Sequence, residues 1–424
     1  TYANDSLTIV SVGEAELLKQ KILIEDFYTA NDTLSSEAKK SSSLLEIVLN
    51  DFKFYGDQFQ IKRRMGPKKK DVNYQTYTSI DTNYLVRGEL LLKGDKKLLE
   101  LSVFDIASKN VRQKYEYTYI NNRSLAHEIA DDIYKTIVGK QAIFTDKIVF
   151  VSDVNSKKGN KELFIMDFDG ANKKQLTFHR GVVLSPAVSH DGKKILYSLI
   201  DETKGRRKNV SLRILDLDTK KSQIVSNKPG INSGAIFTNR NDEIILTMSV
   251  DGNAEIYRLD LKTKKRTRLT KHWSPDVDPS LNHDGTLLTF LSGRPGSPMI
   301  YLMNPSSLEN NVKRIGFVGR FNGTPRFSPD GREIAFSAWL DNRFDIFKLN
   351  SDGTGLGRLT KDFGSNESPD YSKDGQFIVF TSLRVITQKK ADQNLYIMDR
   401  EGKILGPVTS GFGNCKSPRW LKSL

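Results

Sequence analysis

The sequence of 424 residues contains a single cysteine, Cys415, and only five histidines. One cysteine cannot form a disulfide within the chain, and by itself it cannot hold a metal ion. No apolar run approaches the roughly 20 residues that a membrane-spanning helix needs. The sequence also lacks a G-x-S-x-G nucleophile motif, a P-loop and a dinucleotide-binding fingerprint. We therefore expect a protein that is not an enzyme and has no membrane span, no cofactor and no resident metal.

Positive charge is in excess, with 65 lysines and arginines against 51 acidic residues and a net charge of +14. Such a balance favours anionic partners, among them nucleic acid. The charge is scattered, however, and the dense basic run at residues 62–64 and 68–70 has no aromatic residues spaced for base stacking. We interpret this run as a solvated loop and expect no nucleic-acid partner.

One pattern of residues recurs through the C-terminal part of the chain. FNGTPRFSPDGREIAFSAW (residues 321–339) and SNESPDYSKDGQFIVFTSL (365–383) share a proline, an aromatic residue, a serine, an Asp-Gly turn and an alternating apolar run. Related copies occupy residues 185–199 and 279–292, and a degenerate copy occupies 234–249. Alternation of apolar and polar residues after each turn predicts a β-strand.

The turn residue of each copy marks the period of the repeat. The five turn residues are Gly192, Asn241, Gly285, Gly331 and Gly375, and they lie 49, 44, 46 and 44 residues apart. In the degenerate copy we expect Asn241 to adopt the left-handed conformation that glycine adopts elsewhere. The turn joins the strand of the opening pattern to the alternating strand that follows it, and two further short strands come after these. Each unit therefore has four strands and about 45 residues.

Units of this kind predict a β-propeller, because a single four-stranded sheet cannot bury both of its faces. We predict six blades within residues 141–424. The strand at 147–152 has no copy of the opening pattern before it, whereas SPRWL at 417–421 is such a copy without a blade. We therefore predict that 417–421 is the innermost strand of the blade formed by 147–177, which closes the ring and leaves no long edge open.

Residues 1–140 lie outside the repeat and predict a separate α+β domain. Strands are expected at 21–27, 57–63, 83–94 and 97–106, and helices at 35–56 and 121–140. The overall fold class is thus two-domain, with an N-terminal α+β domain followed by an all-β six-bladed propeller. The chain begins at Thr1 rather than Met, and we leave open whether a signal peptide was removed or the sequence was shortened.

The chain resembles the TolB family, the soluble periplasmic components of the Tol-Pal envelope system. The repeat unit is similar to that family's propeller unit, most clearly in TPRFSPDG at residues 324–331. More specific is the passage from that family's last N-terminal helix into its first blade. It is matched by RSLAHEIADDIY (123–134) and then by Val138-Gly139, Phe144-Thr145, Lys147-Ile148 and Val151-Ser152, whereas Gln141-Ala142 stands where the family usually has a glycine. The resemblance covers nearly the whole chain.

This resemblance implies a monomeric, non-enzymatic scaffold in the periplasm. It implies a propeller that binds the peptidoglycan-associated lipoprotein Pal and an N-terminal segment that binds TolA, with a role in outer-membrane integrity and in constriction during cell division. For TolA the residues are Leu7, Ile9, Val10 and Val12. An ion in the propeller channel is left open.

The repeat register itself suggests which loops meet a partner. The connections between each blade's outer strand and the next inner strand gather on one face, and they carry the aromatic and arginine side chains typical of protein interfaces. The predicted contact residues are Phe178, Arg180, His272, Trp273, Arg320, Phe321, Asn322, Asn366, Glu367 and Phe412.

Two alternatives remain at this stage. An accessory or catalytic propeller of a peptidase or sugar-active enzyme would need a cluster of carboxylates or a metal in the axial channel. A nucleic-acid binder would lose its affinity steeply as salt increases. The match over both domains favours the envelope scaffold.

Overall fold

The computed structural model describes residues 19–66, 71–156, 159–201, 210–387 and 390–422. The chain forms two compact units, residues 1–144 and 145–424. The boundary lies four residues later than the predicted one, because Ile143 and Phe144 are buried and the Phe144 ring contacts Phe52, Tyr55 and Tyr134 of the first unit. Among the described residues, no helix is both long and apolar enough to cross a membrane.

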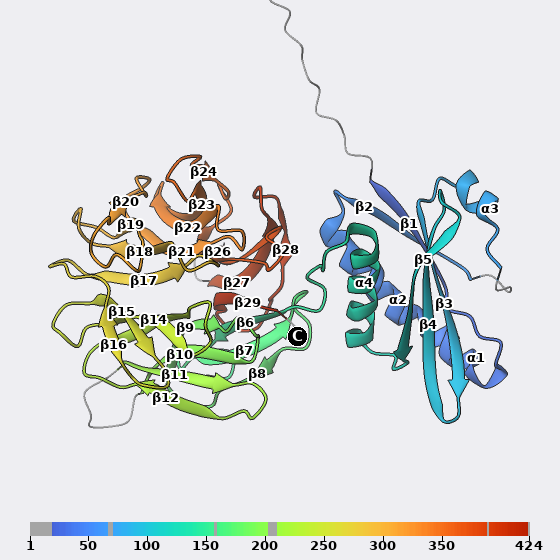
Figure 1. Ribbon diagram of the computed structural model, residues 1–424, viewed down its shortest axis with the longest axis horizontal. Helices are drawn as coiled ribbons and strands as arrows, with labels where there is room; N and C mark the ends of the chain where they lie inside the picture. Colours follow the sequence, from blue (N-terminus) through green and yellow to red (C-terminus); the bar gives the residue numbers. More distant parts are fainter. Residues whose placement is uncertain (1–18, 67–70, 157–158, 202–209, 388–389, 423–424) are drawn as a thin grey trace, which may run out of the picture. The chain divides into compact units, whose positions relative to one another are not determined.

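The N-terminal unit is a five-stranded sheet with the order β2-β1-β3-β4-β5. Its strands are β1 (Gln20–Glu25), β2 (Phe59–Arg64), β3 (Tyr84–Lys93), β4 (Lys96–Asp105) and β5 (Asn110–Thr118). β1 runs parallel to both β2 and β3, and the other pairs are antiparallel. The helices are α1 (Ser35–Lys40), α2 (Ser42–Phe52), α3 (Tyr74–Ser79) and α4 (Arg123–Val138), with short 3-10 turns at Asp32–Leu34 and Lys53–Tyr55. Helices α2 and α4 pack together beside the sheet (Figure 1).

The sequence predicted the last helix of this unit well. The side chain of Asn122 accepts a hydrogen bond from the Leu125 N–H at the start of α4, and Gly139 ends the helix with φ +81°. The single helix expected at 35–56 is instead divided at Ser41 into α1 and α2. Strand β5 was not predicted, because its largely exposed residues NVRQKYEYT lack the apolar alternation of a half-buried strand.

The second unit is a ring of six four-stranded antiparallel sheets, which confirms the predicted propeller (Figure 1). The innermost strands are β9 (Val182–Val188), β13 (Asn232–Phe237), β17 (Asp276–Leu281), β21 (Asn322–Phe327), β25 (Ser365–Tyr371) and β29 (Lys416–Leu421). The second strands are β6 (Lys147–Ser152), β10 (Lys194–Ile200), β14 (Glu243–Met248), β18 (Leu288–Ser292), β22 (Glu333–Leu340) and β26 (Phe377–Thr387).

The outer half of each blade completes the ring. The third strands are β7 (Glu162–Asp167), β11 (Val210–Asp216), β15 (Glu255–Asp260), β19 (Met299–Met303), β23 (Arg343–Asn350) and β27 (Lys390–Asp399). The outermost strands are β8 (Lys174–Gln175), β12 (Ser222–Ser226), β16 (Arg266–Arg268), β20 (Lys313–Arg314), β24 (Gly357–Arg358) and β28 (Ile404–Pro407).

The core of the ring lies between neighbouring blades. Val149 and Leu163 of one blade pack in one cluster with Val183, Ile195 and Tyr197 of the next, and all five side chains are buried. Equivalent clusters join the later pairs of blades. Each sheet therefore buries both faces against its neighbours, as a single sheet cannot.

The ring closes as predicted, because the C-terminal strand pairs with the first strand of the unit. The blade order is β29-β6-β7-β8, and Trp420 lies opposite Ile148 in the antiparallel register. The Trp420 side chain is fully buried.

The turns between the first and second strands follow the predicted pattern in four blades. Gly192, Gly285, Gly331 and Gly375 have φ between +68° and +78°. The prediction for Asn241 was wrong, because its φ is not positive. In this turn the Glu243 N–H donates to the Arg240 carbonyl, which places Asn241 at a turn position where negative φ is ordinary.

We expect Trp420→Ala to destabilise the ring unit by about 3–5 kcal/mol, because it removes a large buried side chain from the closing strand. Urea unfolding measures this change. Trp273→Ala, at an exposed position, is the matched control and should change stability by less than about 0.5 kcal/mol. Equal loss of stability in both variants would contradict the closing role of β29.

Candidate functional site

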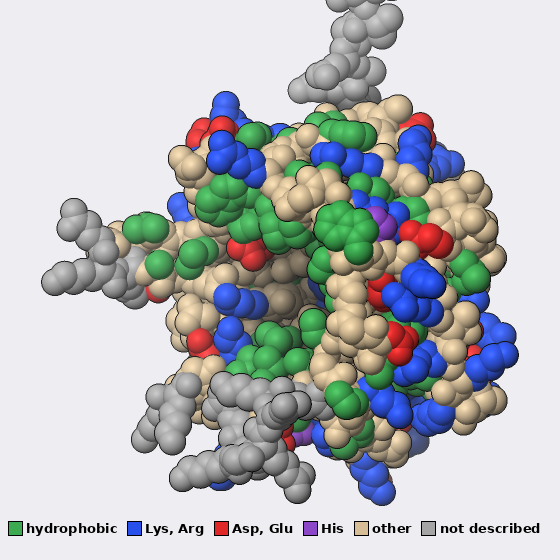
Figure 2. Space-filling model, turned by 90° about the vertical axis from the view of Figure 1, so that its left-hand side faces the viewer, with side chains coloured by type: hydrophobic (Ala, Val, Ile, Leu, Met, Phe, Trp, Pro, Cys, Tyr) green, Lys and Arg blue, Asp and Glu red, His purple; other side chains and the backbone are tan. Residues whose placement is uncertain are grey.

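Two sets of connections emerge at the same end of the ring, because the strands of each blade alternate in direction. They join the outermost strand of one blade to the innermost strand of the next, and the second strand of each blade to the third. We call this end the loop face. Figure 2 shows it as a rim of side chains, many of them hydrophobic, around a central hollow.

Large aromatic side chains stand exposed on the loop face. Phe178 is 75% exposed and Trp273 is 79% exposed. Phe321 is partly exposed, and its ring packs edge-on against Phe344 at 5.7 Å between centroids. Phe317, which the sequence analysis did not select, is also exposed, beneath the Arg314 guanidinium. Exposed aromatic side chains of this size are common anchors of protein interfaces.

Buried carboxylates hold two of these loops in place. The Oε1 atom of Glu255 accepts the backbone N–H of His272 at 2.7 Å, and its Oε2 atom accepts the Thr270 hydroxyl at 2.6 Å. Two blades earlier in the chain, Glu162 accepts the backbone N–H of Arg180 and the Thr177 hydroxyl at the same distances. Charge-assisted bonds to a buried carboxylate are strong, so the loops carrying Phe178 and Trp273 are held rigidly.

Some of the predicted contact residues hold loops in place rather than face solvent. Asn322 is buried, and its side chain donates to the Val318 carbonyl at 2.8 Å. Asn366 is likewise buried and donates to Oδ1 of Asp345 at 3.1 Å. The ring of Phe412 packs at 5.3 Å between centroids from Phe164. These side chains position the loops that carry the exposed ones.

The remaining predicted residues lie at the surface or in the hollow. Arg180 and Arg320 are exposed, and Arg180 has φ +58°. The half-buried His272 ring lies 5.3 Å from the Trp273 ring, and its Nδ1 accepts the Ser274 N–H. Glu367 lines the hollow, where burial raises the pKa of its carboxyl group and the Lys416 charge lowers it by a smaller amount.

The hollow is a cavity of about 360 Å³, walled by the innermost strands. Each of these six strands is interrupted by a bulge where its register against the second strand shifts. At every bulge one residue has φ between +47° and +58°, and these residues are Ser185, Gly234, Asp278, Thr324, Ser368 and Ser417. Four of these residues, Ser185, Gly234, Asp278 and Thr324, line the cavity.

The opposite end of the channel brings together His190 and His283, which lie in the turns of two different blades. The rings of His190 and His283 lie 6.0 Å apart, edge to face. Burial lowers the pKa of His190, and the charges of Lys373 and His283 lower it further. The turns of different blades converge at the axis, which spacing along the chain did not reveal.

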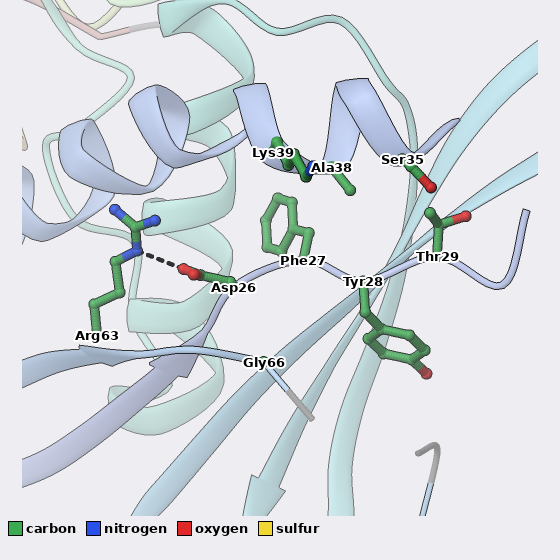
Figure 3. Close-up of a pocket in the computed structure, with 9 residues that line it drawn as sticks. All are labelled: Asp26, Phe27, Tyr28, Thr29, Ser35, Ala38, Lys39, Arg63 and Gly66. Carbon is green, nitrogen blue, oxygen red and sulfur yellow. Dashed lines mark hydrogen bonds and ion pairs between the residues drawn. The ribbon is translucent and has the colours of Figure 1, made fainter. Parts of the chain in front are cut away.

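The N-terminal unit has a separate surface cavity of about 510 Å³ (Figure 3). The Phe27 ring points toward α1, and Tyr28 points away from it. Arg63 forms an ion pair with Asp26 at the rim. Burial raises the pKa of Tyr28 to about 12, and its hydrogen bond to Glu89 contributes to this increase.

The predicted TolA-binding residues Leu7, Ile9, Val10 and Val12 lie outside the described residues.

Comparison with known proteins identifies a matching family and several similar proteins. The family model for the TolB beta propeller domain matches residues 134–423. A TolB homolog of Chlorobium chlorochromatii is 32% identical over 67% of this chain and 64% of its own length. The Tol-Pal system protein TolB of Syntrophotalea carbinolica is 33% identical over 32% of this chain and 31% of its own length. The matches thus span less than two thirds of these curated relatives.

A solved structure has the same fold over almost the whole chain. The crystal structure of TolB from Acinetobacter baumannii superimposes with a TM-score of 0.76 at 24% identity, and it covers 96% of this chain and 97% of that one.

We expect Thr270→Val to lower the free energy of unfolding by about 1–3 kcal/mol, because it removes one hydrogen bond from the buried Glu255 carboxylate and another from the Ile256 N–H. Chemical denaturation measures the change. Thr263→Val, at an exposed turn position, is the control and should stay within about 0.5 kcal/mol of the unmodified protein. If both variants were equally stable, the carboxylate would not be what holds the loop.

Proposed function

The chain belongs to the TolB family of β-propeller proteins, and we propose that it is a protein-binding scaffold of the Tol-Pal system in the periplasm. In this proposal the loop face binds the peptidoglycan-associated lipoprotein Pal, and the N-terminal segment binds TolA. The protein thereby supports outer-membrane integrity and constriction during cell division.

One observation carries the first part of the proposal: exposed aromatic side chains stand on loops that buried carboxylates hold in place. Phe178 and Trp273 occupy equivalent connections of different blades. Phe178 lies two residues before the Arg180 N–H that Glu162 binds, and Trp273 directly follows the His272 N–H that Glu255 binds. A rigid anchor loses little conformational entropy on binding. An interface of standard size needs roughly 800 Å² from each partner, and the end of a six-bladed ring offers an area of that order.

The charged residues of the hollow do not favour the enzymatic alternative. A catalytic propeller would bring carboxylates together to act as acid and base. Here Asp278 accepts a hydrogen bond from the Arg326 guanidinium at 3.1 Å, and the charge that acts on the pKa of Glu367 is that of Lys416. We therefore propose binding without chemical turnover.

We expect Phe178→Ala combined with Trp273→Ala to weaken binding of a soluble Pal-type lipoprotein domain by at least tenfold, because hot-spot residues contribute about 2 kcal/mol or more each. Titration calorimetry with the full chain measures this affinity. Ile224→Ala, at an exposed position on the outermost strand β12, is the control and should leave the affinity unchanged.

Unchanged affinity in the double variant would reject the loop face as the Pal-binding surface. A steep loss of affinity with salt for nucleic acid, together with no lipoprotein binding, would favour a nucleic-acid binder instead.

We expect deletion of residues 1–12 to abolish binding to the periplasmic domain of TolA while leaving Pal binding unchanged. The segment contains Leu7, Ile9, Val10 and Val12, an apolar set suited to pairing as an added strand. Surface plasmon resonance with both partners distinguishes the outcomes. Retained TolA binding by the shortened chain would refute this assignment.

A further inference from the structure

Two buried arginines, Arg326 and Arg419, lie on innermost strands that are not neighbours. In each innermost strand, the residue directly after the bulge pairs with the second strand of the same blade. The six residues at this position form one layer around the axis. The layer consists of Ala187, Ile236, Ser280, Arg326, Asp370 and Arg419.

The two guanidinium groups differ in their partners. Arg326 is 8% exposed and donates to Oδ1 of Asp278 at 3.1 Å and to the Pro325 carbonyl at 2.6 Å. Arg419 is 6% exposed, and its hydrogen bond goes to the carbonyl of the adjacent Pro418 at 2.8 Å. Among the described residues, no carboxylate forms an ion pair with Arg419. Its remaining N–H groups therefore lack an acceptor of opposite charge.

A buried guanidinium of this kind remains charged, because arginine does not lose its proton in proteins. Burial lowers the pKa of Arg419 to about 10, with a further contribution from the like charge of Arg326. The carboxylates of Asp370 and Asp278 raise this pKa by smaller amounts. One oxygen of Asp370 is already occupied by the Trp420 N–H at 2.8 Å. A buried charge that forms no ion pair is unfavourable, and a bound anion relieves it.

The surroundings leave an approach to this layer. Ala187 and Ser280 are small, so two of the six layer positions contribute little side-chain volume near the axis. Asp278, which accepts from Arg326, also lines the cavity of about 360 Å³ that opens on the loop face. Lys416 lies on the same strand as Arg419 and adds a further positive charge near the wall. Asp278 thus links the cavity to the arginine layer, and this is the approach that we infer for an anion from the loop face.

We propose that the axial hollow is a carboxylate-binding site in which the guanidinium of Arg419, supported by Arg326, holds the anion. Arginine presents a planar pair of N–H donors that matches the two oxygens of a carboxylate. The carboxylate comes either from a free small anion or from an acidic side chain of a protein bound at the loop face. Only this second source rests on the proposed function.

Saturation-transfer NMR with the full chain and sodium acetate tests the site directly, at constant ionic strength maintained with sodium chloride. We expect acetate to receive saturation from the unmodified protein and from Arg320→Met, whose arginine is exposed on the loop face. We expect Arg419→Met to lose the effect. Arg419→Lys keeps the charge without the paired donors and should bind acetate at least threefold more weakly.

Arg326→Met serves as a second variant in case Arg419→Met does not fold, and it should also weaken acetate binding. Equal acetate binding by Arg320→Met and the folded Arg419 or Arg326 variants would overturn the proposal, as would no binding by the unmodified chain. This test needs no partner protein, so its outcome is separate from that of Pal binding.

A second measurement identifies the source of the carboxylate. If a partner's acidic side chain fills the site, 100 mM acetate should weaken Pal binding relative to chloride, and Arg419→Lys should weaken it without acetate. If Pal affinity is the same in all these conditions while acetate still binds, the ligand is a free carboxylate. Acetate binding that is absent in solution at every concentration tested refutes both sources.

Discussion

The pairing of β29 with β6 is the contact on which the ring depends. The two strands come from opposite ends of the propeller sequence, and their register places Trp420 in a fully buried position opposite Ile148. Without this pair the first blade would lack its innermost strand and leave an open edge beside the axis. Every other blade contact joins residues closer in sequence, so the geometry of the whole ring follows from this long-range closure.

Closure also determines what the ring can offer to another molecule. Six innermost strands converge on one axis, and each is interrupted by a bulge that contains a residue of positive φ. Because the blades are locked side by side, buried carboxylates such as Glu162 and Glu255 can bind the loops of their own blade and hold Phe178 and Trp273 outward. The loop face is thus rigid for the same reason that the ring is stable. The convergence that builds the hollow also brings Arg326 and Arg419 into one layer.

The repeat made the fold readable from the sequence, but residue roles were harder to assign. Register alone placed Asn322 and Asn366 on the loop face, where their position is correct but their side chains turn inward to hydrogen bonds. A polar residue next to a strand looks the same in the sequence whether it meets solvent or a buried acceptor. Strand β5 was missed because most of its residues are exposed and so do not form the apolar face by which a strand is recognised. The conformation of Asn241 was predicted wrongly because its turn differs from the glycine turns of the other blades.

The sequence alone determined the number of blades, the closing strand and the boundaries of most repeats, because these follow from local alternation and from turn residues at a regular spacing. Only the tertiary structure decided which side chains meet across the axis. Arg419 and Arg326 are far apart in the chain, as are His190 and His283, and no local pattern distinguishes them from surface residues. Their proximity arises from the curvature of the closed ring, which packing between whole blades sets and no single repeat encodes.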